Sequence, residues 1–261
     1  MATGRLEHTP EGWDASGEGY ERFIAPFFAH FARDALRLVG VRPGDRVLDV
    51  AAGPGTLALL AARQAAAVVA VDFAPGMVAR LRGQARTAGL TNLAAAMMDG
   101  QALAFPDDSF DAVFSMFGLI FFPDRAAGFR ELHRVLRPGG TAAVAGWHRS
   151  ISTAFAQAAR RAIPGLPTPT SLSLQDPDVF VREMRRAGFT QVEVQSVTHH
   201  WEVPTPEAAW EAIKDSSPVF AAYAGEQMAA IRPLFLEEQR AEFGEGAVRL
   251  EAEAHLGLGT K

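Results

Sequence analysis

The 261-residue chain contains no cysteine, which excludes disulfides, thiolate metal sites and cysteine nucleophiles. It has no cluster of lysine or arginine and its formal charge is −5, so a nucleic acid partner, whose phosphates need a basic surface, is not expected. No apolar run approaches the ~20 residues of a membrane span, and the N-terminus has no basic segment followed by an apolar stretch. We therefore expect a cytoplasmic protein with no membrane partner.

Apolar residues make up 48% of the chain, which is enough to bury a full core in one domain. The stretch IPGLPTPTSLSLQDP is rich in proline, serine and threonine and predicts a loop. Two or three helices are expected after residue 204, with Pro233 starting a new segment. The predicted single domain consists of an N-terminal helical segment (1–40), a core (41–150), a loop (151–175), further sheet strands (176–203 and 245–261) and a helical insertion (204–244).

A glycine-rich turn follows the first predicted strand. Residues 47–56 read VLDVAAGPGT, in which an apolar run that carries Asp49 is followed by Gly53 and Gly55 and then by a helix-like stretch. Glycine allows a sharp turn with positive φ and a close approach of backbone to ligand, and the next helix adds its positive N-terminal end. The pattern predicts a site for a nucleotide-like cofactor.

A carboxylate ends the next apolar run. Asp72 follows residues 68–71 about twenty positions after the glycines, where it can accept hydrogen bonds from both hydroxyls of a ribose. Gly53, Gly55 and Ala58 also fit the spacing of a dinucleotide-binding turn, so this much suits NAD or another adenosine ligand.

The rest of the series is more specific. Asp99 and Gly100 close a third predicted strand, residues 110–116 predict a fourth, and Pro138-Gly139-Gly140 stops a helix before a fifth strand that runs to Trp147. In this order the motifs resemble the class I S-adenosylmethionine-dependent methyltransferases, in particular the small-molecule branch (methyltransferase type 11) that includes the ubiquinone and menaquinone C-methyltransferases. The resemblance covers residues 40–150.

The resemblance implies an α/β fold: a Rossmann-like, mostly parallel seven-stranded sheet with the last strand antiparallel, flanked by helices and helical lid insertions. It implies S-adenosylmethionine as the cofactor, with its methionine end at Gly53 and Gly55, its ribose at Asp72 and its adenine at Asp99. Asp49 would lie near the ammonium group. The full set assigned to the cofactor is Tyr20, Asp49, Ala51, Gly53, Gly55, Asp72, Phe73, Met77, Asp99, Gly100 and Met116.

Two assignments in this set need comment. Ala51 stands where many relatives have glycine, and its methyl group costs space only if the ligand passes directly over it. Tyr20 and Trp13 lie in the N-terminal segment that folds over the cofactor in the resembled family. They are candidates for a lid, and packing against the sheet is the alternative.

The chemistry requires little from the protein, because a sulfonium already activates its methyl group and the enzyme chiefly aligns the acceptor and excludes water. A base is needed only when a hydroxyl must lose its proton. His148, at the carboxyl end of the fifth strand, is the first candidate, and a surface histidine bound to a loop carbonyl is the alternative. The residues assigned to the acceptor are Phe117, Ile120, Trp147 and Tyr223, and core packing explains such apolar residues equally well.

Three functions remain open. The leading one transfers a methyl group to an oxygen, carbon or nitrogen of a small, largely apolar molecule. A nicotinamide-dependent oxidoreductase would share Gly53, Gly55 and Asp72. The third is an S-adenosylmethionine-binding protein without methyl transfer, for example one that guides a cyclisation. The chain lacks the Asp-Asn pair of the magnesium-dependent catechol methyltransferases, so we predict no metal. The acceptor and the oligomeric state, a homodimer included, are left open.

Overall fold

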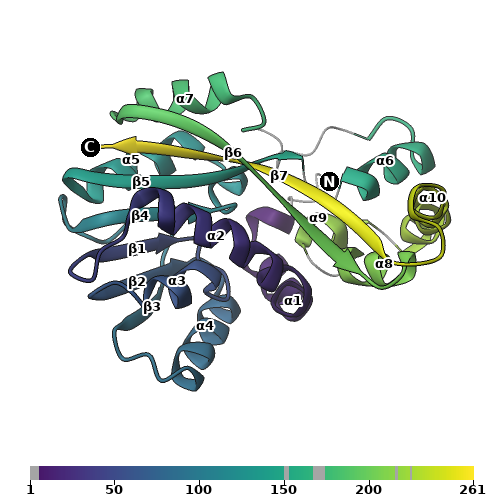
Figure 1. The fold of residues 1–261 in the computed structure, drawn as a ribbon, viewed down its shortest axis with the longest axis horizontal. Helices are drawn as coiled ribbons and strands as arrows, with labels where there is room; N and C mark the ends of the chain where they lie inside the picture. The colour runs from purple at the N-terminus through teal and green to yellow at the C-terminus, as the bar shows by residue number, and fades with distance from the viewer. Residues whose placement is uncertain (1–5, 150–152, 167–173, 215–216, 224) are drawn as a thin grey trace.

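A computed structural model of the chain describes residues 6–149, 153–166, 174–214, 217–223 and 225–261. Its centre is a seven-stranded sheet in the order β3-β2-β1-β4-β5-β7-β6 (Figure 1). All neighbouring pairs are parallel except those of β7, which runs antiparallel to β5 and β6. The predicted fold class is thus confirmed. The strands are β1 (Arg46–Val50), β2 (Ala67–Asp72), β3 (Leu93–Met97), β4 (Phe110–Met116), β5 (Leu136–Arg149), β6 (Thr190–Val203) and β7 (Val248–Thr260).

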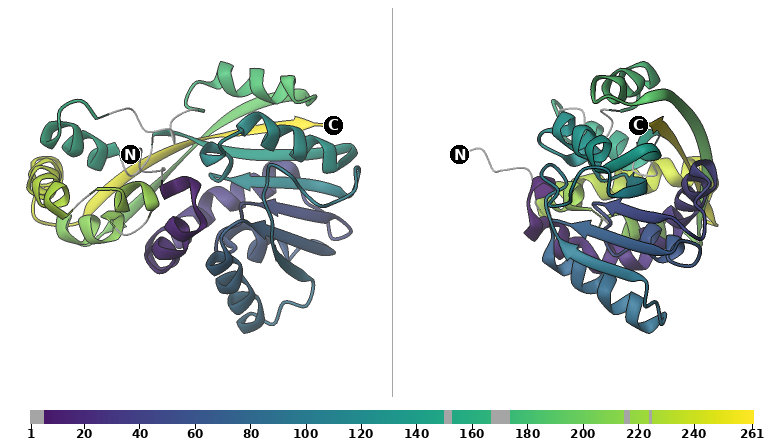
Figure 2. Two further views of the ribbon diagram at one scale, coloured as in Figure 1. Left: turned by 180° about the vertical axis from the view of Figure 1, so that it is seen from behind. Right: turned by 90° about the vertical axis from the view of Figure 1, so that its left-hand side faces the viewer.

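Helices cover both faces of the sheet. Helices α2 (Ala25–Val39) and α3 (Thr56–Ala61) lie together on one face, and α5 (Arg125–Val135) and α7 (Pro177–Arg186) lie on the other (Figures 1 and 2). Helix α4 (Pro75–Thr87) packs along β2 and β3. Because both faces are covered, the central strands read as continuous apolar runs, and Val47, Leu48 and Val50 of β1 have no exposed surface.

The N-terminal segment is a chain of short helices beside the carboxyl ends of the strands. A 3-10 turn, η1 (Leu6–His8), leads into α1 (Pro10–Gly19), and a π-helical turn, η2 (Tyr20–Ile24), joins α1 to α2. Thr9 caps α1 by accepting a hydrogen bond from the Gly12 amide, 3.2 Å away. Helix α1 packs on α4, so the N-terminal segment is fixed across the edge of the sheet.

A second group of helices packs at the far end of the long strands β6 and β7 (Figure 1). These are α6 (Thr153–Ala162), α8 (Pro206–Lys214), α9 (Pro218–Ala221) and α10 (Gly225–Phe243). Their core is aromatic: the Phe155 ring stacks on Trp210 with centroids 5.7 Å apart, and Phe220 lies 4.7 Å from Phe155. None of the described helices combines the length and the apolarity of a membrane span.

Two predictions about these helices were wrong. Residues 151–175 are not one loop, because α6 lies within them and buries Phe155, Ala158 and Ala159, largely against α10. Pro233 does not start a segment but lies inside α10. The helix continues past Pro233 because the packing of Ile231 and Phe235, which are buried on either side of it, offsets the loss of the proline's amide donor.

Candidate functional site

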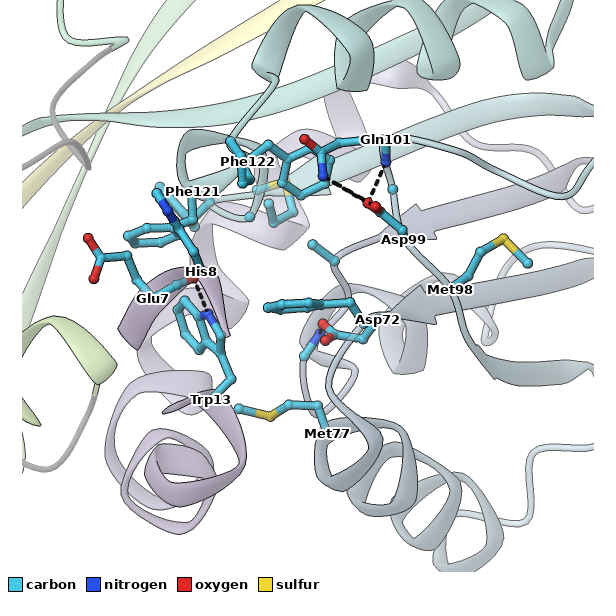
Figure 3. A pocket seen from close by; sticks show the side chains of 18 of the residues that line it. Glu7, His8, Trp13, Asp72, Met77, Met98, Asp99, Gln101, Phe121 and Phe122 are labelled. Carbon is cyan, nitrogen blue, oxygen red and sulfur yellow. Dashed lines mark hydrogen bonds between the residues drawn. The ribbon is translucent and has the colours of Figure 1, made fainter. Parts of the chain in front are cut away.

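A pocket lies at the carboxyl ends of β1, β2 and β4, beneath the N-terminal segment (Figure 3). Its cavity volume is about 230 Å³, a little below the roughly 300 to 1,000 Å³ typical of small-molecule clefts. Its walls consist of Glu7, His8, Trp13, Tyr20, Ala51, Gly53, Asp72, Phe73, Met77, Met98, Asp99, Gly100, Gln101, Met116, Phe117, Gly118, Phe121, Phe122 and Pro123. Nine of the eleven residues that the sequence assigned to the cofactor are therefore brought together.

The glycine turn forms one wall of the pocket. Gly53 has φ of 56°, and a Cβ added there would meet nothing within 4 Å, so its backbone is open to a ligand. Gly55 precedes α3 at φ of 96°, with Leu81 where a side chain would go. Ala51 also adopts a positive φ, of 56°, which costs an L-residue roughly 1–2 kcal/mol and which glycine would adopt without this cost.

Asp49 lies behind this wall rather than on it. Its side chain is 1% exposed, and Oδ2 accepts a hydrogen bond from the Ala58 amide in the first turn of α3, 3.0 Å away. Burial raises the pKa of Asp49 to about 8, and the nearby Asp72 adds to the rise. Asp49 and Gly55 are the two cofactor assignments that do not line the pocket.

Asp72 joins the second strand to the glycine turn. Its Oδ2 accepts from the Gly53 amide at 2.8 Å, and its Oδ1 accepts from the Ala74 amide at 2.9 Å. Burial raises its pKa to about 6 against these stabilising bonds, and Asp14 adds to the rise. Each carboxylate oxygen keeps a further lone pair, so the group can still accept from a ligand hydroxyl.

Asp99 and Gly100 occupy the neighbouring wall. The exposed Asp99 carboxylate accepts from the Gln101 amide at 2.8 Å and from the Gln101 side chain at 3.0 Å. A Cβ at Gly100 would lie 2.5 Å from the Phe122 ring and 2.7 Å from Val50. Only glycine therefore allows the backbone at residue 100 to pack against the Phe122 ring while remaining at the pocket surface.

Aromatic residues of the N-terminal segment cover the pocket. The Trp13 ring meets Phe121 edge-on at 5.2 Å, and its Nε1 donates to the Glu7 carbonyl at 2.9 Å. Burial, with Asp72 and Asp49 nearby, raises the pKa of Tyr20, so its hydroxyl stays neutral. The Asp14 carboxylate accepts from the Gly76 amide at 2.8 Å and ties α1 to α4.

The residues assigned to the acceptor are not all brought to this pocket. Phe117 lines it at φ of 61° and stacks on Trp147, with centroids 3.9 Å apart and planes 12° apart. Trp147 and Ile120 are buried and do not line it. Tyr223 packs on Phe155 in the distant helical group, with centroids 5.5 Å apart.

His148, assigned as the base, also lies outside the pocket. Successive residues of a strand point to opposite faces, so His148 turns away from the side of Trp147. Its Nδ1 lies 3.5 Å from the Gln175 carbonyl and its Nε2 lies 3.9 Å from Glu253 on β7. This is the loop-carbonyl contact of the alternative interpretation.

Sequence reasoning missed three polar residues of the pocket. Gln101 could have been found from its place beside Asp99. Glu7 and His8 carry no local signal of a site, because they precede the Thr9-Pro10 start of α1 and reach the pocket only through the packing of η1 on α1.

The amino-acid sequence of the chain is similar to those of known proteins. Residues 47–140 match the model of a family described as a methyltransferase domain. An uncharacterised protein of Mycobacterium tuberculosis is 47% identical over 108 residues, which are 41% of this chain and 39% of that protein. The chain thus spans well under half the length of this relative. A demethylmenaquinone methyltransferase of Corynebacterium urealyticum is 31% identical over 225 residues, or 76% of this chain and 94% of that enzyme.

Solved structures share the fold. The YcgJ protein of Bacillus subtilis superposes with a TM-score of 0.61 at 21% identity, covering 89% of this chain and 98% of that one. The (4+2)-cyclase SpnF superposes with a TM-score of 0.60 at 22% identity, covering 89% of this chain and 81% of that one. The fold, the motif series and a 31% identical relative matched over 94% of its length lead to one conclusion: the chain belongs to the class I S-adenosylmethionine-dependent methyltransferases.

Proposed function

We propose that this protein transfers the methyl group of S-adenosylmethionine to a small, largely apolar molecule. The observation that carries the proposal is the pairing of Asp72 with the open backbone of Gly53 at the edge of the pocket. The carboxylate can accept hydrogen bonds from a ribose, and the ligand-accessible glycine turn beside it leaves room for an amino acid tail. Membership of the methyltransferase family leaves the nicotinamide-dependent alternative without support.

The donor set of the pocket fits this cofactor. Asp72 would accept from the ribose hydroxyls, Asp99 would accept from the adenine amine, and the amides near Gly53 would face the methionine end. The buried Asp49 carboxyl behind the turn supplies a negative charge when a cationic ammonium lowers its pKa. The space over Gly53 is open, whereas that over Gly100 is filled, so the pocket offers room along the turn and a close backbone contact at the purine end.

The cofactor, when bound, supplies a methyl group already activated by a positively charged sulfur. This chain's residues then have to exclude water and orient the acceptor, which by proximity alone is worth about 7–11 kcal/mol. Trp13, Phe121 and Phe122 cover the pocket with apolar surface, and aromatic faces also attract a sulfonium cation. The same walls favour a flat or oily acceptor. We also propose that the protein binds neither nucleic acid nor membranes, because its formal charge of −5 does not favour contact with their negatively charged surfaces.

The first experiment measures cofactor binding by isothermal titration with S-adenosylhomocysteine and, separately, with NAD. We expect saturable binding of S-adenosylhomocysteine and none of NAD. Asp72→Ala should weaken the binding of S-adenosylhomocysteine by about 3 kcal/mol, on the order of 100-fold, because two charge-assisted hydrogen bonds are lost. Asp178→Ala, which removes an exposed carboxylate at the start of α7, is the control and should bind normally. Tight NAD binding, or unchanged affinity in Asp72→Ala, would contradict the proposal.

The second experiment asks whether a methyl group is transferred. The protein is incubated with radiolabelled S-adenosylmethionine and fractions of a host metabolite extract, and label in the organic phase is counted. Transfer that depends on Asp72 supports the proposal. Cofactor binding without transfer to any fraction would instead favour the S-adenosylmethionine-binding protein that guides another reaction.

A further inference from the structure

One titratable side chain of the pocket wall, His8, has no role in the cofactor site described above. It lies on η1, and Figure 3 shows it with Trp13 of α1 and with Phe121, across the pocket from Asp72. His8 is half-buried and lines the pocket. Among the described residues, no hydrogen bond or ion pair reaches its imidazole.

The backbone on both sides of His8 is held in place. The Glu7 carbonyl accepts from Trp13 Nε1 at 2.9 Å, and the Thr9 amide donates to the Leu6 carbonyl at 3.1 Å. Gly12 lets η1 approach α1 closely, because a Cβ there would lie 2.3 Å from the Leu6 carbonyl oxygen. The imidazole is thus carried by a fixed turn rather than by a free end of chain.

The other titratable groups that line the pocket are unsuited to take a proton from an acceptor. Asp72, whose oxygens each accept from a backbone amide, is assigned to the ribose, and Asp99, which accepts from Gln101, is assigned to the adenine. The raised pKa of Tyr20 keeps its hydroxyl protonated. The Glu7 carboxylate is turned away from Asp72 in Figure 3. Helix α9, which also packs on η1, carries no titratable residue.

We propose that this aromatic wall binds the acceptor as a flat hydroxyl compound such as a phenol, and that His8 takes the hydroxyl proton during methyl transfer. The inference rests on the proposed function. In the step, the acceptor O–H bond breaks and its proton goes to a ring nitrogen of His8. The oxygen bonds the methyl carbon, and the electron pair of the broken carbon–sulfur bond stays on sulfur. The products are the methyl ether, a neutral thioether and a protonated imidazole, so charge and atoms balance.

The test uses para-nitrophenol as the probe, because its anion has a visible absorption band that the neutral phenol lacks. Protein saturated with S-adenosylhomocysteine is titrated with the probe at a pH below the pKa of the free phenol. If His8 accepts the proton, a saturable anion band appears in the wild type and falls at least about 10-fold in His8→Phe, because no base remains beside the bound phenol. His200→Phe is the control, because His200 lies on β6 beside Glu251 and outside the pocket.

A second variant tests the position of the turn. In Gly12→Ala the new methyl group collides with the Leu6 carbonyl, so η1 must move and the anion band should fall while His8 itself is kept. Titration with S-adenosylhomocysteine separates the possible failures. If the wild type does not bind it, the proposed function fails. If it binds but gives no anion band, if the band is equal in His8→Phe, or if the band is lost in His148→Phe instead, the role of His8 is refuted.

Discussion

Asp49→Asn is expected to remove a strong pH dependence from the stability of the cofactor-free protein. The Asp49 carboxyl is 1% exposed and its pKa rises from 3.8 to about 8, chiefly by burial. Asparagine has the same shape and can still accept from the Ala58 amide, which Asp49 contacts at 3.0 Å. The substitution therefore removes the titration and keeps the packing.

The sign of the effect follows from proton binding. Between pH 3.8 and about 8 the folded protein holds a proton on Asp49 that the unfolded chain has released, so the free energy of unfolding falls as the pH rises. Each pH unit within this window lowers the free energy of unfolding of the wild type by about 1.4 kcal/mol, which amounts to about 3 kcal/mol between pH 5 and pH 7. Asp72, with a pKa of about 6, adds a slope of the same sign, but that slope is common to both proteins.

Urea unfolding followed by circular dichroism at pH 5, 6 and 7 measures this difference. The free energy of unfolding of Asp49→Asn minus that of the wild type should grow steadily with pH, and saturating S-adenosylhomocysteine should reduce the growth because its ammonium favours the charged carboxylate. Asp178→Asn, at an exposed site, should follow the wild type. Parallel curves for Asp49→Asn and the wild type would show that burial does not hold the proton on Asp49, and the reasoning would be refuted.

Three further predictions concern the backbone. Ala51→Gly should raise the free energy of unfolding by up to about 1 kcal/mol in chemical denaturation, because glycine tolerates the φ of 56° without strain; a loss of stability would contradict this. Gly55→Ala should destabilise by more than about 1 kcal/mol and lower affinity for S-adenosylhomocysteine, since φ is 96° and Leu81 fills the space; wild-type behaviour in both assays would count against the turn geometry. Pro233→Ala, at an exposed position inside α10, should raise the melting temperature by restoring an amide donor, with an unchanged or lower value as the opposing result.

Agreement between sequence and structure is closest where one short segment defines the feature. Residues 110–116 form β4 as predicted, and Asp72 stands at the end of β2. The disagreements depend on packing between distant segments. The proline of α10 would end a helix in isolation, but Ile231 and Phe235 are buried on either side of it. Helix α6 is stabilised because its face that carries Phe155 packs on α10, which lies more than sixty residues further along the chain.

The amino-acid sequence by itself determined the order of the central strands, the glycine turn and the strand-end carboxylates of the pocket edge, because apolar periodicity, glycine φ preferences and strand-end carboxylates are local properties. Tertiary structure alone decided which side chains share the pocket. It brought η1 with His8 to the wall opposite Asp72, and it left His148 beside Gln175 and Trp147 beneath Phe117. The physical reason is that a side chain's surroundings depend on how distant elements pack, and such packing has no signature in the few residues around it.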